Sequence, residues 1–221
     1  MRSSSSSIVI HLSALGHHYV VDGEILVKKI HLPLGPPKGM PDGEARNWYR
    51  GKNFILRPLV LITTVNREGK HNAAIKTNFM TVSSMKSYAF CCKPEHHTYR
   101  NVLETGEFVI NVPTDDIMDK VLKVATITVN PPSPGVSEIE RAGLTPILSE
   151  EVRPPRIEEC VAHYECLFDW HRDAVIFGKV VAVSVDKELL EGADFRKPVM
   201  IGAGTDSYFT VGEAMKWPKA P

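Results

Sequence analysis

Short apolar runs separated by turn residues fill most of the chain from about residue 53 onward. The run "LVLITTV" ends in the turn signal "NREGK", and "HNAAIKTNFMTVSS", residues 71–84, follows as the expected partner strand of a hairpin. Further strands are expected at residues 88–92, 108–113, 161–170, 175–186, 198–204 and 208–212. Many short strands with turns between them predict a mainly β (α+β) fold built on a closed or nearly closed barrel.

One short helix is expected from about Thr98 to Thr105, because a glycine such as Gly106 is favoured just past a helix end. The stretch "HHTYRNV" opens this helix. Taken alone, Thr98 is most simply an N-cap that satisfies a free backbone N–H group. The alternative is an anion site, because a helix start also offers unpaired N–H groups and partial positive charge to a phosphate. Further donors close in sequence are Lys93, His96, His97 and Arg100.

A second helix is expected after Thr114, a candidate N-cap. Asp115 and Asp116 lie in its first turn, and Lys120 and Lys123 are expected late in the helix, as the helix dipole favours. Its apolar positions fall on one face, so we expect it to pack on the barrel. These positions are Ile117, Val121 and Val124.

Residues 1–46 lie before the regular pattern of apolar runs and turns begins. We interpret them as an N-terminal extension and connector that precedes the barrel domain at residues 47–221. A hairpin around Asp22 and Gly23 is possible in this extension. The proline- and glycine-rich segment 33–46 has no repeating apolar pattern.

Charge excludes several function classes. Lysine plus arginine equals aspartate plus glutamate at 26 each, so no global charge attracts nucleic acid or an acidic membrane surface. No apolar run is long enough to cross a bilayer, and the N-terminus has no convincing signal-peptide core. We expect a soluble, cytoplasmic protein.

Cys160, His163 and Cys166 have a spacing that suggests a metal site. On a strand, however, the two cysteines share one face and the histidine lies on the other. Structural zinc sites normally need four convergent ligands. We therefore expect core cysteines and no metal site.

Small polar side chains crowd the predicted strands between residues 63 and 84. Strand alternation cannot place all of them in water, because Thr63 and Thr64 are neighbours, as are Thr77 and Asn78. Unpaired buried hydroxyls and amides are costly, so these groups favour a polar ligand.

The common catalytic motifs are missing from the sequence. "GAGTDS" at residues 202–207 resembles a dinucleotide loop, but too few residues follow it for a βαβ unit. No nucleophile turn, P-loop or HExxH motif occurs. Polar binding groups without an obvious nucleophile or general base indicate that a cofactor performs the chemistry.

Four stretches carry a family resemblance in their order and spacing: residues 57–84, 96–113, 140–160 and 175–183. Between about Asn47 and Gly212 the chain resembles the flavin reductase-like, FMN-binding split-barrel proteins, in particular the flavoredoxin branch. The resemblance implies a split β-barrel with Greek-key-like connections and a few peripheral helices. It also implies a homodimer with FMN at the interface and the FMN phosphate near the His-Thr helix start.

The resemblance implies ten cofactor-binding residues in three groups. They are Thr64, Asn78, Phe79 and Met80 near the flavin ring; Ser83 and Ser84 at the ribityl chain or phosphate; and Lys93, His97, Thr98 and Asn101 at the phosphate. One departure concerns Ser137, Glu138 and Ile139, where relatives commonly carry Asp-Lys-Phe. An acidic Glu138 is expected to weaken phosphate or nicotinamide binding if this loop reaches the cofactor.

Three hypotheses follow. The first is an FMN-dependent reductase or electron-transfer protein, with NADH or NADPH as donor and a small molecule or redox partner protein as acceptor. The second is a flavin-binding or flavin-carrier module without turnover. The third is a barrel that binds another phosphorylated cofactor such as pyridoxal phosphate.

Overall fold

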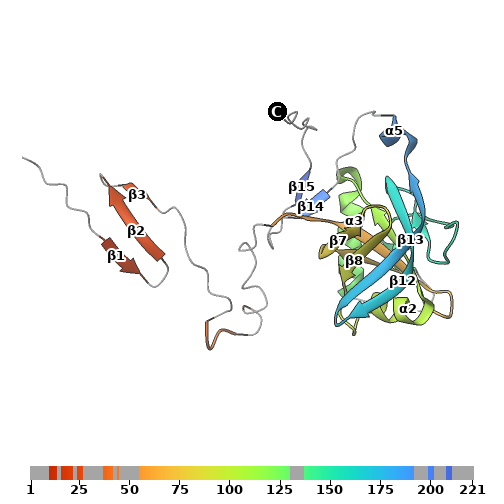
Figure 1. The fold of residues 1–221 in the computed structure, drawn as a ribbon, viewed down its shortest axis with the longest axis horizontal. Coiled ribbons are helices and arrows are strands. Elements are labelled where there is room, and N and C mark those ends of the chain that lie inside the picture. Colours follow the sequence, from red (N-terminus) through yellow and green to blue (C-terminus); the bar gives the residue numbers. More distant parts are fainter. Residues whose placement is uncertain are drawn as a thin grey trace, which may run out of the picture. The chain divides into compact units, whose positions relative to one another are not determined.

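The computed structural model describes residues 10–13, 16–21, 24–26, 37–41, 44, 55–129, 137–191, 199–201 and 208–210. The chain divides into two compact units, Met1–Phe54 and Ile55–Pro221. In the first unit, β1 (Ile10–Ser13), β2 (Gly16–Val21) and β3 (Glu24–Leu26) form an antiparallel sheet (Figure 1). The hairpin predicted here is present, because Val21 pairs with Glu24. Most of segment 33–46 and all of segment 202–207 lie outside the described residues.

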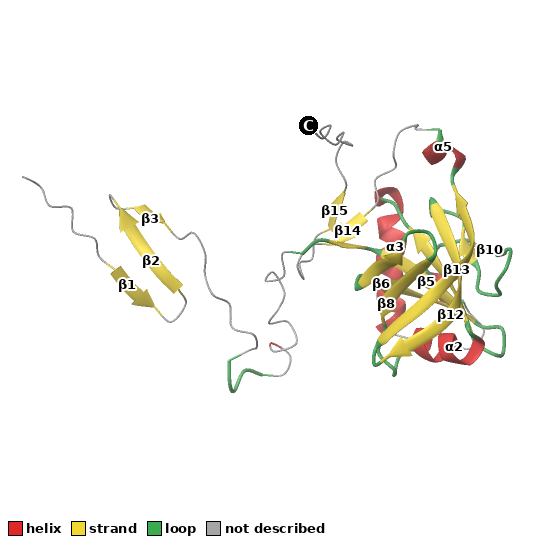
Figure 2. Cartoon of the chain, viewed as in Figure 1, coloured by secondary structure: helices red, strands yellow, loops and turns green. Residues whose placement is uncertain are grey.

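Seven antiparallel strands of the second unit form one curled sheet, a half-barrel (Figure 2). The predicted mainly β fold is therefore confirmed. The order across the sheet is β6-β5-β9-β12-β13-β8-β7. The strands are β5 (Val60–Val65), β6 (His71–Lys76), β7 (Phe79–Ser83), β8 (Ser87–Cys91), β9 (Glu107–Val112), β12 (Ala162–Arg172) and β13 (Val175–Val185).

The two edge strands of this sheet, β6 and β7, follow each other in the chain without pairing to each other. The prediction of one strand over residues 71–84 is therefore wrong. The strand breaks at Thr77 and Asn78, and the Asn78 carbonyl accepts a hydrogen bond from Cys91 N–H at the end of β8 (2.9 Å). This bond aligns β7 with β8, whereas β6 pairs with β5.

Strand β5 lies between two apolar cores, and all six of its residues are buried. Val60 and Ile62 pack into the barrel interior, and Leu61 packs toward the helices. Thr63 donates its hydroxyl hydrogen to the Pro155 carbonyl (2.5 Å). Its polarity therefore serves internal hydrogen bonding.

The apolar core that contains Leu61 is covered by three short helices. They are η1 (Asp115–Ile117), α3 (Met118–Val129) and α4 (Glu138–Arg141). The predicted apolar face is confirmed, since Ile117, Val121 and Val124 are buried. The prediction that Lys120 and Lys123 lie late in the helix is wrong. They lie in the first half of α3, because the helix continues to Val129.

Helix α2 (His97–Thr105) ends as predicted at Gly106, which adopts the left-handed conformation (φ 76°) and donates its N–H to the Val102 carbonyl. The helix starts at His97, one residue before the predicted start at about Thr98. His96 is the N-cap, and Thr98 is the second helical residue. The interpretation of Thr98 as a helix cap is therefore wrong.

Smaller elements complete the second unit. β10 (Pro146–Ile147) pairs with β11 (Arg156–Ile157), and β14 (Val199–Ile201) pairs with both β4 (Arg57–Pro58) and β15 (Tyr208–Thr210). The short helix α5 spans Lys187–Leu190. No helix among these described segments is long and apolar enough to cross a membrane.

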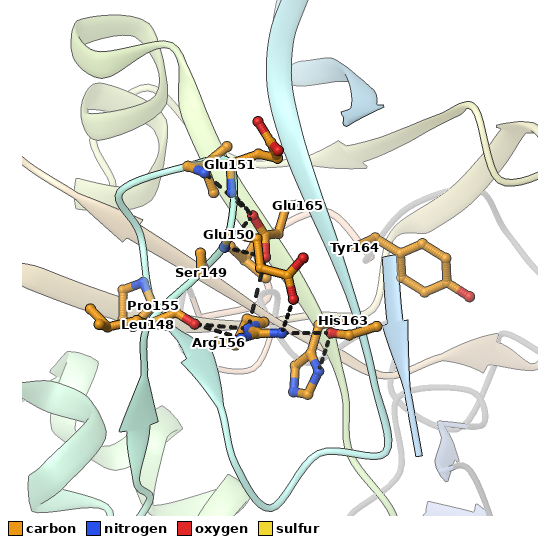
Figure 3. A network of polar contacts seen from close by, with 12 residues as sticks. Leu148, Ser149, Glu150, Glu151, Pro155, Arg156, His163, Tyr164 and Glu165 are labelled. Atoms are coloured by element: carbon orange, nitrogen blue, oxygen red, sulfur yellow. Dashed lines mark hydrogen bonds and ion pairs between the residues drawn. The ribbon is translucent and has the colours of Figure 1, made fainter. Parts of the chain in front are cut away.

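A buried carboxylate fixes the loop between β10 and β11 (Figure 3). Glu165 of β12 accepts hydrogen bonds from the backbone N–H groups of Glu150, Glu151 and Val152 at 2.7–3.3 Å. Arg156 lies 3.8 Å from the same carboxylate and donates to the Leu148 carbonyl. The loop is therefore held against β12 by the buried Glu165 carboxylate, which accepts its backbone N–H groups and lies near the half-buried Arg156.

The core-cysteine interpretation is confirmed. Cys160 and Cys166 are buried in different cores, where burial raises the pKa of both thiols. Cys160 lies in a turn before β12, so the strand alternation assumed for it is wrong. His163 instead contacts the Ile157 carbonyl through Nε2 (2.8 Å).

Candidate functional site

A cluster of four buried polar side chains lies where α2 packs on β5 and β6. Asn72 of β6 pairs with Thr64 of β5 in the strand ladder, so their side chains share one face. Thr98 and Asn101 are three residues apart on α2 and face the sheet together. Each of the four side chains is at most 8 % exposed.

Hydrogen bonds join this cluster, which we call the Asn72 cluster. One end of the Asn72 amide lies 3.2 Å from Thr64 Oγ1 and 3.1 Å from Thr98 Oγ1. Asn101 Nδ2 donates to Thr64 Oγ1 at 3.0 Å. The cluster unites three of the predicted residues, Thr64, Thr98 and Asn101, through a residue that was not on the predicted list.

The other end of the Asn72 amide faces a buried carboxylate. It lies 3.0 Å from Glu138 Oε2, which also accepts the Ala73 backbone N–H at 3.1 Å. Burial raises the pKa of Glu138, while the Ala73 N–H group and the His97 and Lys70 side chains act to lower it. Glu138, the first residue of α4, therefore lies at the candidate site. The weakening of phosphate or nicotinamide binding expected from this acidic residue stays a prediction.

Two cavities flank Asn72 and His97, which line both of them. A cavity of about 370 Å³ runs along the side of α2 toward the β5–β6 turn. It is lined by Asn66, Glu68, Lys70, His71, Asn72, His97, Arg100, Asn101, Glu104 and Glu138.

The second cavity, of about 430 Å³, lies at the start of α2. Its further polar lining consists of Lys76, Glu95, His96 and Thr98. Burial and the nearby Lys76 ammonium lower the pKa of His96. Since the first N–H groups of a helix have no partner within the helix, this cavity combines backbone donors with a lysine and two histidines.

An apolar cleft of about 270 Å³ lies beyond the break between β6 and β7. Its lining includes the predicted residues Asn78, Phe79 and Met80, together with Ala89, Phe90 and Cys91 of β8. Arg57 also lines the cleft and donates to Asn78 Oδ1 at 2.6 Å. This bond orients the Asn78 amide at the cleft.

Three predicted residues lie away from these cavities. Ser83 and Ser84 are exposed at the far end of β7, next to Met85, which has a positive φ of 58°. Lys93 is exposed and lies 3.8 Å from Glu95. None of the three lines the cavities described above, and their role in binding stays a prediction.

The ten predicted cofactor-binding residues leave out Asn72, Arg57, Lys70 and Lys76, although Asn72 and Lys76 belong to the polar side chains crowded between residues 63 and 84, which favour a polar ligand. Asn72 had a usable signal, because strand pairing across the turn at residues 66–70 places it opposite Thr64. Arg57 had no such signal, since it meets Asn78 only through the folding of the barrel.

Comparison with known proteins identifies the family and the fold. The family model described as "Flavin reductase like domain" matches residues 53–201. An uncharacterized protein of Aquifex aeolicus is 31 % identical over 150 residues, which cover 62 % of this chain and 73 % of the relative.

Two solved structures share the fold. A split-barrel protein assigned as a flavin reductase from Shewanella frigidimarina superposes with a TM-score of 0.68 at 22 % identity, covering 82 % of this chain and 95 % of that one. Flavoredoxin of Desulfovibrio vulgaris superposes with a TM-score of 0.64 at 22 % identity, covering 76 % and 94 %. The predicted split barrel is therefore confirmed.

Proposed function

Because the chain belongs to the flavin reductase-like domain family, whose model matches more than half of it, we propose that it is an FMN-dependent oxidoreductase. A flavin-related, oxidoreductase-type function follows from the family. The finer proposal is that NADH or NADPH donates two electrons and that a small molecule or a redox partner protein accepts them.

The observation that carries the proposal is the cavity at the start of α2. Lys76, His96 and His97 surround the first turn of the helix, with the Thr98 side chain on the same wall. The Lys76 ammonium, imidazole N–H groups and free backbone N–H groups are donors of the kind that bind phosphate oxygens. This donor set fits the phosphate of FMN.

The apolar cleft supports a place for the flavin ring. Phe79 and Met80 supply apolar surface, and the Asn78 amide, held by Arg57, supplies one oriented polar group. Small-molecule sites commonly combine apolar walls with a few fixed polar groups. We propose that Asn78, Phe79 and Met80 contact the ring, as the family resemblance implies.

The side chains of this protein have binding and orienting roles in the proposal. Bound flavin supplies the electron-transfer chemistry, so the protein needs no nucleophile of its own. Thr64, Thr98 and Asn101 fix the phosphate end through the Asn72 cluster, and Arg57 fixes Asn78 at the ring end. No catalytic residue is assigned.

We also propose a homodimer. Several apolar side chains of the barrel strands are at least 41 % exposed, which supports a partner surface. They are Met80 of β7, Leu167 and Trp170 of β12 and Val181 of β13. The cytoplasmic location stays a prediction.

The visible spectrum of the purified protein, before and after anaerobic addition of NADH or NADPH, tests the proposal. Tightly bound flavin that is bleached by either nucleotide supports the reductase. Tightly bound flavin that neither nucleotide reduces would favour the flavin-carrier alternative. A protein that binds no flavin would favour a different phosphorylated cofactor, such as pyridoxal phosphate.

A further inference from the structure

The Asn72 amide lies between two groups that impose opposite demands on it. One end faces only Glu138 Oε2, at 3.0 Å. The other end faces the Thr64 and Thr98 hydroxyls at 3.2 and 3.1 Å and the Ala73 N–H at 3.3 Å. An amide has a donating end and an accepting end, so the protonation state of Glu138 determines which end faces the threonines.

With Glu138 ionised, its oxygens can only accept hydrogen bonds. The Asn72 amide group then donates to Glu138, and Asn72 Oδ1 accepts from both threonine hydroxyls. Both hydroxyl hydrogens therefore point toward Asn72. Thr98 then presents only lone pairs to the adjacent cavity, and lone pairs repel a phosphate oxygen.

With Glu138 protonated, the acid can donate its hydrogen to Asn72 Oδ1. The amide is then turned by 180°, and Nδ2 donates to Thr64 Oγ1 and Thr98 Oγ1. The Thr98 hydroxyl hydrogen is released and can point to an anion. The two arrangements differ in heavy atoms only by the exchange of Asn72 Oδ1 and Nδ2.

We propose that Glu138 is a positioning residue that couples proton uptake to the binding of a phosphate at the start of α2. It acts through Asn72, whose amide orientation sets the direction of the Thr98 hydroxyl. The inference rests on the proposed function, because the phosphate meant is that of FMN.

The charges around Glu138 favour this coupling. Burial raises the pKa of Glu138, although the Ala73 N–H group, His97 of α2 and Lys70 of the β5–β6 turn act to lower it. Arg100 and Glu104 of α2, Glu68 of the turn and His71 of β6 line the same cavity. A bound phosphate places negative charge beside His97 and Thr98, which favours the neutral acid. Electrostatics and hydroxyl direction therefore act in the same sense.

Calorimetric titration with FMN and with riboflavin, in buffers of different ionisation enthalpy, measures the protons taken up on binding. The wild-type protein is expected to take up a proton with FMN but not with riboflavin. Above the pKa of Glu138, FMN affinity should fall by up to about tenfold per pH unit. Glu138→Gln, whose amide can donate to Asn72 Oδ1 as the neutral acid does, should take up less proton and bind FMN more tightly at high pH.

Glu104→Gln is the matched control. Glu104 lines the same cavity but lies 3.1 Å from Arg67 and does not contact Asn72. It should leave proton uptake unchanged. A second variant, Thr98→Val, has no hydroxyl to redirect, so adding Glu138→Gln to it should change FMN affinity and proton uptake less than the same substitution does in the wild-type background. Any proton uptake by His97 persists in Glu138→Gln and is subtracted.

Equal proton uptake by the wild-type protein and a folded Glu138→Gln variant would overturn the inference. If Glu138→Gln does not fold, a proton uptake by Thr98→Val equal to that of the wild type overturns it instead. Failure of the proposed function is distinct, because neither FMN nor riboflavin would then bind. Inorganic phosphate is then the probe, and the same comparison of proton uptake decides.

Discussion

At the scale of one residue, substitution of Thr98 separates a structural role of its hydroxyl from a role in binding. Its hydroxyl bonds the Asn72 side chain, so Thr98→Val should lower the free energy of unfolding by about 1–3 kcal/mol, the cost of leaving a buried polar group short of a partner. If the hydroxyl also binds phosphate, FMN should bind about ten- to a hundredfold more weakly, with riboflavin unaffected. Equal losses for both ligands would remove Thr98 from the phosphate site.

The matched control for this measurement is Thr105→Val. Thr105 lies on the same helix and donates to the Asn101 carbonyl at the other end of α2. It should leave the ratio of FMN to riboflavin affinity unchanged. Fluorescence titration of both ligands gives this ratio for each protein.

The lowered pKa of His163 predicts that the stability of the fold depends on pH. Burial first, and then the Arg156 charge, lower its pKa below 6.5, although the Ile157 carbonyl acts to raise it. The folded protein therefore binds fewer protons at His163 than the unfolded chain. Its contribution to stability is complete above pH 6.5 and is lost as the pH falls toward the lowered pKa.

Urea denaturation of the wild-type protein and His163→Gln at several pH values measures this contribution. Glutamine can still donate to the Ile157 carbonyl but does not titrate. We expect the variant to lose less stability than the wild type on acidification. Identical pH profiles would mean that His163 takes no part in acid destabilisation.

Residue types in the site were predictable from the sequence, whereas their connections were not. The family pattern gave Thr64, Thr98 and Asn101, and all three meet in the Asn72 cluster. Glu138 is 66 positions from Asn72 in sequence and reaches it through α4 packing. Turn and helix signals are local and cannot reveal such a contact.

At the scale of elements, strands were predicted well because β-branched runs and turn residues are local signals. The break at Thr77 and Asn78 was missed, since residues 71–84 read as one continuous strand pattern. What divides them is the pairing of β7 with β8 instead of β5. The break between β6 and β7 is thus set by tertiary strand pairing, and the candidate cleft lies directly beside this break.

Gly178 lets the backbone of β13 lie close against the barrel core. A Cβ atom at this position would lie 2.2 Å from the Phe108 ring, which is fully buried and packs edge-to-face on Phe90. Gly178→Ala should therefore destabilise the fold by about 1–3 kcal/mol, the usual cost of overpacking. Urea denaturation measures this loss.

The double variant Gly178→Ala/Phe108→Leu tests the cause. A smaller side chain at Phe108 removes the overlap, so the alanine should cost less in that background. The same cost in both backgrounds would place the strain in the backbone of β13 and not in the Phe108 contact.

At the scale of the whole molecule, the N-terminal unit is predicted to be dispensable for FMN binding. The described strands β1, β2 and β3 pair with one another, and the family match begins only at residue 53. A chain without residues 1–40 should bind FMN within about tenfold of the full chain, or about 1.4 kcal/mol. A larger loss of affinity would show that the extension contributes to the site.

Dimer formation affects the site as a whole, because a partner subunit could cover both the exposed apolar side chains of β12 and β13 and the flavin. Trp170 and Phe177 stack at 3.8 Å between ring centroids on β12 and β13, with Trp170 47 % exposed. Val181 of β13 is 41 % exposed. Covering such side chains favours association, and two-fold dimers are the commonest closed assembly. Sedimentation equilibrium at micromolar concentration should give twice the chain mass of 24.6 kDa.

A charged substitution on this surface should disrupt both the assembly and the cofactor site. Val181→Glu is expected to shift the protein toward monomer and to weaken FMN binding by at least about tenfold, because a flavin at the edge of a single barrel would be left exposed to water. Leu148→Glu is the control, since Leu148 is 88 % exposed on the loop between β10 and β11 and should change neither property. A wild-type monomer that binds FMN tightly would rule out a site that depends on the dimer.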